Sequence, residues 1–170
     1  MSGSNRVRFR RILREAEGYL DLNLPYNALE VLGRMKEPGT FRGHKLFLSG
    51  QALDALGRYD EACPTLEEAV DLLPSDVDVW IALGACYRHA GRLDMAIGTL
   101  ERAQELEPRP TLLYRLARYC SLAGEKSRAL EFLSRAIALE PNFRDQLSDE
   151  ADFDPLRSDP EFQALTSIIV

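Results

Sequence analysis

The side chains that most often carry chemistry are few in this chain and lie far apart along it. His44 and His89 are its two histidines, and neither is spaced from a cysteine or an acid as in a zinc site. Glu67, Glu68 and Asp71 share one face of an expected helix, where carboxylates are usually solvated. The sequence contains neither a phosphate-binding glycine loop nor a serine nucleophile elbow. We therefore expect no enzyme activity, no cofactor and no metal site.

The three cysteines, Cys63, Cys86 and Cys120, form no C-x-x-C motif. Each has apolar neighbours in an expected helix, where a thiol packs as a small hydrophobic side chain. The positions of Cys86 and Cys120 on neighbouring expected helices would allow a disulfide between them, but no motif favours it. The N-terminal residues lack the apolar stretch of a secretory signal, and no apolar run is long enough to span a bilayer. Cysteine usage and these segments predict a cytoplasmic protein.

A repeated pattern indicates the elements that carry these residues. In its clearest copy, large and small residues stand at the spacing W-x2-L-G-x2-Y…A…P, namely Trp80, Leu83, Gly84, Tyr87, Ala96 and Pro108. The same columns return 34 residues earlier as Leu46, Gly50, Leu53, Gly57, Ala62 and Pro74. A degraded copy precedes them at Ile12, Ala16, Tyr19, Asn23, Ala28 and Leu32, and a later one follows at Leu113, Ala117, Cys120, Gly124, Ala129 and Pro141. A register held over four copies predicts four helical hairpins.

The columns have physical explanations. Gly57, Gly91 and Gly124 stand where the first helix of a hairpin should stop, in the left-handed conformation that glycine adopts without strain. Asp60 and Asp94 follow as N-cap or first-turn residues of the second helix. The small residues are expected where the two helices approach closely, at Ala16, Gly50, Gly84 and Ala117 and at Ala28, Ala62, Ala96 and Ala129. Trp80 and Tyr87 are expected in the core.

From residue 9 to about residue 142, the sequence resembles the tetratricopeptide repeat family. The resemblance implies an all-α, right-handed solenoid of four helix-turn-helix units, at residues 9–42, 43–76, 77–109 and 110–142. Residues 1–8 are expected to form a flexible basic N-terminus, and residues 143–170 a C-terminal capping segment. Asp159 and Pro160 are expected to start a final helix that carries Phe162, Leu165, Ile168 and Ile169. This ending resembles those of many bacterial members of the family.

In this family, one column of the first helices tends to face the binding groove, and here it reads Leu13, Phe47, Ile81 and Tyr114. We call the side of the first helices that carries this column and its neighbours the inner face. The candidate partner-binding residues on it are Phe47, Gln51, Ile81, Arg88, His89, Tyr114, Arg115 and Arg118. Apolar anchors beside arginines suit a peptide or protein with acidic residues. For Leu13 and Ile81, simple burial between repeats is an equal alternative.

The resemblance implies a non-catalytic scaffold for protein–protein interaction. The net charge of −6 is unevenly spread, since Arg6 to Arg14 contain no acid while residues 140–161 are acidic. One alternative is therefore a self-assembling structural protein that joins basic N-termini to acidic C-termini. A secretion-type chaperone also fits the size. Nucleic-acid binding is not expected, because the chain is acidic and Phe9 is the one aromatic residue among the N-terminal arginines.

Overall fold

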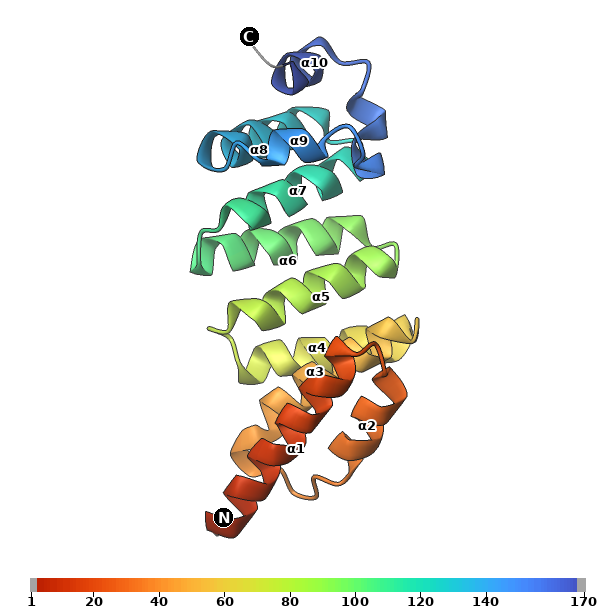
Figure 1. Cartoon of the computed structure of the whole chain (residues 1–170), viewed down its shortest axis with the longest axis vertical. Coiled ribbons are helices and arrows are strands. Elements are labelled where there is room, and N and C mark those ends of the chain that lie inside the picture. The colour runs from red at the N-terminus through yellow and green to blue at the C-terminus, as the bar shows by residue number, and fades with distance from the viewer. Residues whose placement is uncertain (1–2, 168–170) are drawn as a thin grey trace. The chain divides into compact units, whose positions relative to one another are not determined.

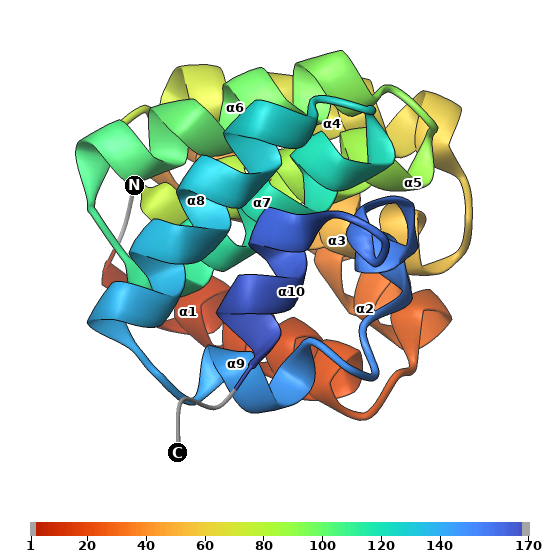
Figure 2. The ribbon, with the colours of Figure 1, turned by 90° about the horizontal axis from the view of Figure 1, so that it is seen from above.

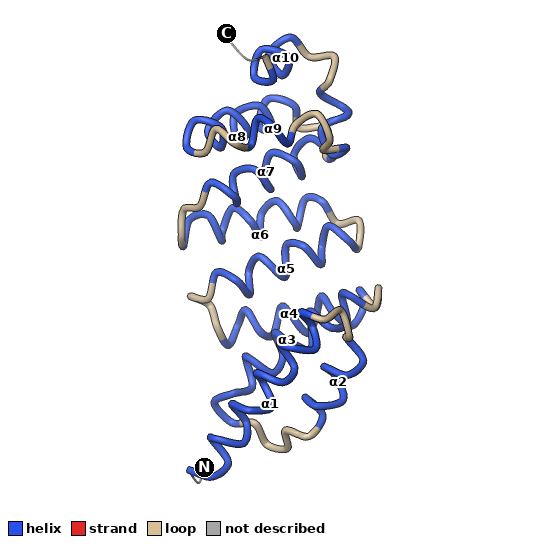
Figure 3. The backbone as a smooth tube through the Cα atoms, viewed as in Figure 1, coloured by secondary structure: helices blue, strands red, loops and turns tan. Residues whose placement is uncertain are grey.

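The computed structural model describes residues 3–167 of the 170-residue chain. Within this range the secondary structure consists of helices joined by short loops, and no strand is present (Figure 3). The chain forms two compact units, Met1–Gly91 and Arg92–Val170, which we call unit 1 and unit 2.

Unit 1 is built from packed helices (Figure 1). They are α1 (Gly3–Asp21), α2 (Pro25–Gly33), the 3-10 helix η1 (Gly39–Phe41), α3 (Arg42–Ala55), α4 (Tyr59–Leu72) and α5 (Val77–His89). Each helix packs against the next, and α3 also contacts α1 and α5. This arrangement places the first helices of successive hairpins, α1, α3 and α5, beside one another.

Unit 2 contains α6 (Leu93–Leu106), α7 (Pro110–Leu122), α8 (Lys126–Leu139), α9 (Phe143–Gln146), the 3-10 helix η2 (Ala151–Leu156) and α10 (Pro160–Thr166). The long helices α6, α7 and α8 pack in sequence. After α8 the chain folds back over the preceding helices. As a result η2 lies against α7, while α9 and α10 contact α8 and each other (Figure 2).

The turns confirm the glycine column. Gly57 and Gly124 have φ values of 71° and 76°, and Asn23, which replaces glycine in the first hairpin, has a φ of 56°. Asparagine tolerates this left-handed conformation better than most residues. Asp60 and Asp94 lie in the first turns of α4 and α6 and are not their N-caps.

Close helix packing explains the small-residue column at Gly50. A Cβ atom added there would lie 2.5 Å from Cγ of Leu66, a separation that real structures do not tolerate. Ala16, Ala62 and Ala117 are fully buried, in agreement with the same expectation. Trp80, in contrast, is only half-buried and donates from Nε1 to the carbonyl oxygen of Pro74 at 2.9 Å.

The two ends of the chain differ in how well they were predicted. Helix α1 begins at Gly3, so the described part of the segment expected to be flexible, residues 1–8, is helical. No proline interrupts it, and its pattern continues into the buried face at Phe9 and Ile12. At the other end, Asp159 caps α10 by accepting from the backbone N–H of Glu161 at 2.8 Å, as predicted. Ile168 and Ile169 lie outside the described residues.

Candidate functional site

In unit 1, the inner face contains a pocket of about 330 Å³ between α1 and α3. Its lining consists of Glu17, Leu20, Asp21, Leu48, Gln51 and Ala55. Leu48 is buried and Leu20 packs against the same core cluster, so these two side chains form an apolar floor. Of the predicted residues, Gln51 lines the pocket, while Phe47 is half-buried and packs against the core cluster beside it.

The charge of this pocket is the opposite of the expected one. Glu17 and Asp21 are exposed at its rim, and its lining includes no basic residue. Carboxylates beside an apolar floor favour a cationic side chain with an apolar neighbour. The predicted arginines were expected to select an acidic partner, but they do not line this pocket.

The other candidates of unit 1 lie on α5. Ile81 and Arg88 are half-buried. His89 is exposed, and its Nδ1 lies 2.9 Å from both carboxylate oxygens of Asp54 on α3. The ring of His89 also lies 6.0 Å from that of Tyr59. This contact fixes the end of α5 against its neighbours.

Two of the cysteines meet inside unit 1. Sγ of Cys63 on α4 lies 2.9 Å from Sγ of Cys86 on α5, and both side chains are buried. Burial, and then the contact with Cys63, raises the pKa of the Cys86 thiol. The pairing considered from the sequence was with Cys120, which belongs to unit 2. Burial raises the pKa of the Cys120 thiol to about 12.

In unit 2, the aromatic anchor expected on the inner face is covered by the chain itself. Tyr114 is only 6% exposed, and its ring stacks on that of Phe143 with centroids 4.6 Å apart. The ring of Phe153 is nearly perpendicular to that of Tyr114, with the two centroids 5.6 Å apart. Burial raises the pKa of Tyr114. In this structure Tyr114 is therefore a core residue.

The neighbouring arginine is also engaged by the C-terminal segment. Nε of Arg118 lies 3.0 Å from a carboxylate oxygen of Glu150, and its terminal nitrogen lies 2.7 Å from Asp152. Arg115, which precedes it by one turn, is exposed. The segment at residues 143–156 thus contacts Tyr114 with aromatic rings and Arg118 with carboxylates.

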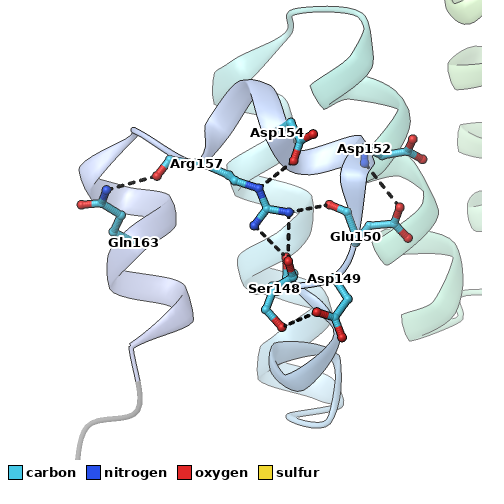
Figure 4. A network of polar contacts seen from close by, with 8 residues as sticks. Ser148, Asp149, Glu150, Asp152, Asp154, Arg157 and Gln163 are labelled. Carbon is cyan, nitrogen blue, oxygen red and sulfur yellow. Dashed lines mark hydrogen bonds and ion pairs between the residues drawn. The ribbon is translucent and has the colours of Figure 1, made fainter.

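A polar network holds this segment in place (Figure 4). The guanidinium of Arg157 donates to Asp154 at 2.6 Å and to the carbonyl oxygens of Ser148 and Glu150 at 3.0 and 3.4 Å. Asp159 pairs with Lys126 of α8. The hydrogen bond from Lys126 and those from the backbone lower the pKa of Asp159 despite its burial. Several acids of the C-terminal cluster therefore have partners inside unit 2.

Sequence reasoning missed the covering role of Phe143 and Phe153. Both are aromatic residues in an acidic stretch with few other apolar residues, and this is the signal that marks them as anchors. The sequence-based prediction also omitted Asp21 from the site, because the pocket between α1 and α3 depends on how the two helices pack.

Two further observations bear on the kinds of site that are present. Among residues 3–167, no group of three or more His, Cys, Asp or Glu side chains is arranged to hold a metal ion. Over the same range, no helix is both long enough and apolar enough to cross a membrane.

Comparisons with known proteins agree with the repeat pattern. The family model for the tetratricopeptide repeat matches residues 47–110. Subunit 3 of the anaphase-promoting complex of Dictyostelium discoideum is 30% identical over 88 residues, which is 52% of this chain. The match spans only 8% of that subunit.

Solved structures share the fold at low sequence identity. MamA from Desulfovibrio magneticus RS-1 superposes with a TM-score of 0.69 at 20% identity, over 77% of this chain and 75% of that one. YrrB, described as a tetratricopeptide repeat protein with an unusual peptide-binding site, gives 0.64 at 22% identity, over 75% of this chain and 66% of that one. Residues 47–110 thus match the tetratricopeptide repeat family model, and the helical hairpins with their glycine turns have the same fold as these solved structures.

Proposed function

We propose that this protein is a non-catalytic cytoplasmic interaction module that binds a partner protein at the inner face of unit 1. Tetratricopeptide repeat proteins generally bind proteins or peptides, and the peptide-binding site of YrrB belongs to the same fold. The observation that carries the proposal is the pocket between α1 and α3, with its apolar floor and acidic rim.

The chemistry of the pocket defines the partner segment. A lysine or arginine can place its charge between Glu17 and Asp21 while an adjacent apolar side chain contacts Leu20 and Leu48. A binding surface on a packed helical scaffold is largely preformed, so binding orders few additional groups. We therefore propose a partner segment that carries basic and apolar side chains, in place of the acidic partner expected from the arginines in the sequence.

The inner face of unit 2 is not included in this proposal. Its aromatic and arginine side chains, Tyr114 and Arg118, already contact Phe143, Glu150 and Asp152. These contacts also bear on assembly through basic N-termini and acidic C-termini, because they occupy part of the acidic cluster. That alternative stays a prediction.

Affinity capture from source-cell lysate, read by quantitative mass spectrometry, tests the proposal. The test variant is Glu17→Gln/Asp21→Asn, which removes the charge of the rim with almost no change in shape. The matched control is Asp71→Asn/Glu131→Gln, which removes the same charge from exposed positions on α4 and α8. A protein retained by the wild type and by the control but lost by the test variant is the expected result.

Equal recovery by all three proteins would refute the pocket as the binding site. A captured protein should also contain a segment with a basic residue next to apolar ones. Synthetic peptides of that segment, with lysine or arginine replaced by glutamine, should bind at least about tenfold more weakly, as expected for loss of a charge-assisted contact.

A further inference from the structure

Helix α1 carries both signs of charge along one side. With 3.6 residues per turn, Arg6, Arg10, Glu17 and Asp21 fall within about 60° of its circumference. All four side chains are exposed, whereas Phe9, Ile12 and Ala16 on another side are buried. We call this set of four residues the charged stripe.

The order of charges in the stripe is self-complementary. The two arginines are one helical turn apart, and so are the two acids, which gives each pair a separation of about 6 Å along the axis. When two copies of α1 run antiparallel about a two-fold axis that crosses the stripe midway along its length, between the levels of residues 13 and 14, Arg6 faces Asp21 of the other copy. In the same register, Arg10 faces Glu17. Symmetry then produces each contact twice.

The stripe has no partners inside unit 1. Within residues 3–167, none of its four side chains forms an ion pair, although Glu15 of the same helix pairs with Arg34 at 3.7 Å. A uniformly charged partner, such as a nucleic acid, would be attracted by one half of the stripe and repelled by the other. An antiparallel copy of the same helix matches both halves.

We propose that two copies of this protein associate through antiparallel α1 helices, with Arg6 on Asp21 and Arg10 on Glu17. Exposed ion pairs are individually weak, so the dimer forms at high protein concentration and low salt. Ionic screening weakens it as salt increases. The inference goes beyond the proposed function. Both use Glu17 and Asp21, but the self-pairing needs the arginines and the partner pocket does not.

Sedimentation equilibrium of the full chain tests the pairing. The wild type is expected to dimerise in 50 mM NaCl, with a dimer dissociation constant that increases about tenfold or more in 500 mM NaCl, as expected for screening of exposed charges. Arg6→Glu/Arg10→Glu and Glu17→Arg/Asp21→Arg are each expected to be monomeric, because like charges then face each other. An equimolar mixture of these two variants should form a heterodimer, since all four contacts again join opposite charges, two of them with the charges exchanged.

The register is tested with single substitutions. Arg10→Glu mixed with Glu17→Arg restores every pair and should associate. Arg10→Glu mixed with Asp21→Arg leaves two like-charge contacts and should remain monomeric. Circular dichroism and thermal melting should be the same for all variants, since the substituted side chains are exposed.

A control double variant, Asp145→Arg/Asp149→Arg, changes the charge of the acidic C-terminal residues 140–161 and should dimerise like the wild type. Loss of the dimer in this variant would overturn the proposal, and so would wild-type chains that stay monomeric in 50 mM NaCl. Dimers that survive the stripe variants would also refute it. The Arg6→Glu/Arg10→Glu variant keeps every pocket residue, so partner capture by this variant separates failure of the pairing from failure of the proposed function.

Discussion

In unit 1, α1 and α3 enclose an open pocket with Glu17 and Asp21 at its rim, whereas in unit 2 the inner face of α7 is covered by Phe143 and Phe153. The repeat pattern places equivalent positions on both faces, and the same glycine turns connect the helices. The difference arises because residues 143–156 supply aromatic rings and carboxylates to α7. Repeat register therefore determines where an inner-face side chain lies, but a segment outside the repeats determines whether it is available to a partner.

Phe153 helps to cover the inner face of α7, and its substitution should have the largest effect on the stability of the covered unit. Its side chain is fully buried against Tyr114 and Phe162. We expect Phe153→Ala to lower the free energy of unfolding by about 3–5 kcal/mol. Urea denaturation measures the change. Phe132→Ala is the control, because Phe132 is only half-buried on α8, and its effect should be much smaller.

Loss of Arg118 should loosen the segment at residues 143–156 from α7, with a smaller loss of stability than the loss of Phe153. Arg118→Ala leaves the buried carboxylate of Asp152 without this guanidinium, which we expect to lower stability by about 1–3 kcal/mol. Hydrogen exchange should accelerate in residues 143–156. Arg102→Ala removes an exposed pair with Glu105 and should leave the exchange unchanged. Unchanged exchange in Arg118→Ala would contradict the role of this pair in holding the segment.

The glycine turns provide a test in which the two units should behave alike. Gly57→Ala and Gly124→Ala each place a Cβ atom in a left-handed conformation, at an expected cost of about 1–2 kcal/mol. Thermal unfolding of the two variants should give similar shifts. Clearly unequal shifts would mean that the hairpins differ in more than the covering of their inner faces.

Alkaline pH should affect unit 2 through Cys120. An exposed cysteine thiol has a pKa of 9.0, and burial raises the pKa of Cys120 to about 12 in the folded chain. As the pH rises, the unfolded chain therefore loses this proton first. The contribution of the protonated, buried Cys120 thiol to the free energy of unfolding is complete below pH 9. It is lost as the pH rises towards 12, by at most about 1.4 kcal/mol per pH unit. Urea unfolding of the wild type and Cys120→Ala between pH 8 and pH 10.5 compares the two slopes, and the variant should have the shallower one. Parallel slopes would exclude this contribution.

The sequence was sufficient for features that depend on neighbouring residues. The turns at Gly57 and Gly124 and the cap at Asp159 follow from local backbone preferences, and the small residue at Gly50 follows from the repeat register. The sequence was insufficient for contacts between residues that are far apart along the chain, because each such residue has several possible partners. The contact of Cys63 with Cys86, and that of Arg118 with Glu150, depend on which side chains the packed helices bring together.

The segment that covers α7 has a further consequence for competition. Because it is joined to α8 by the chain itself, its local concentration at Tyr114 and Arg118 is on the order of millimolar, as for other short tethers. A free peptide that made the same contacts would need a comparable concentration to displace half of it. The inner face of α7 therefore discriminates against weak external ligands without any change in its own residues.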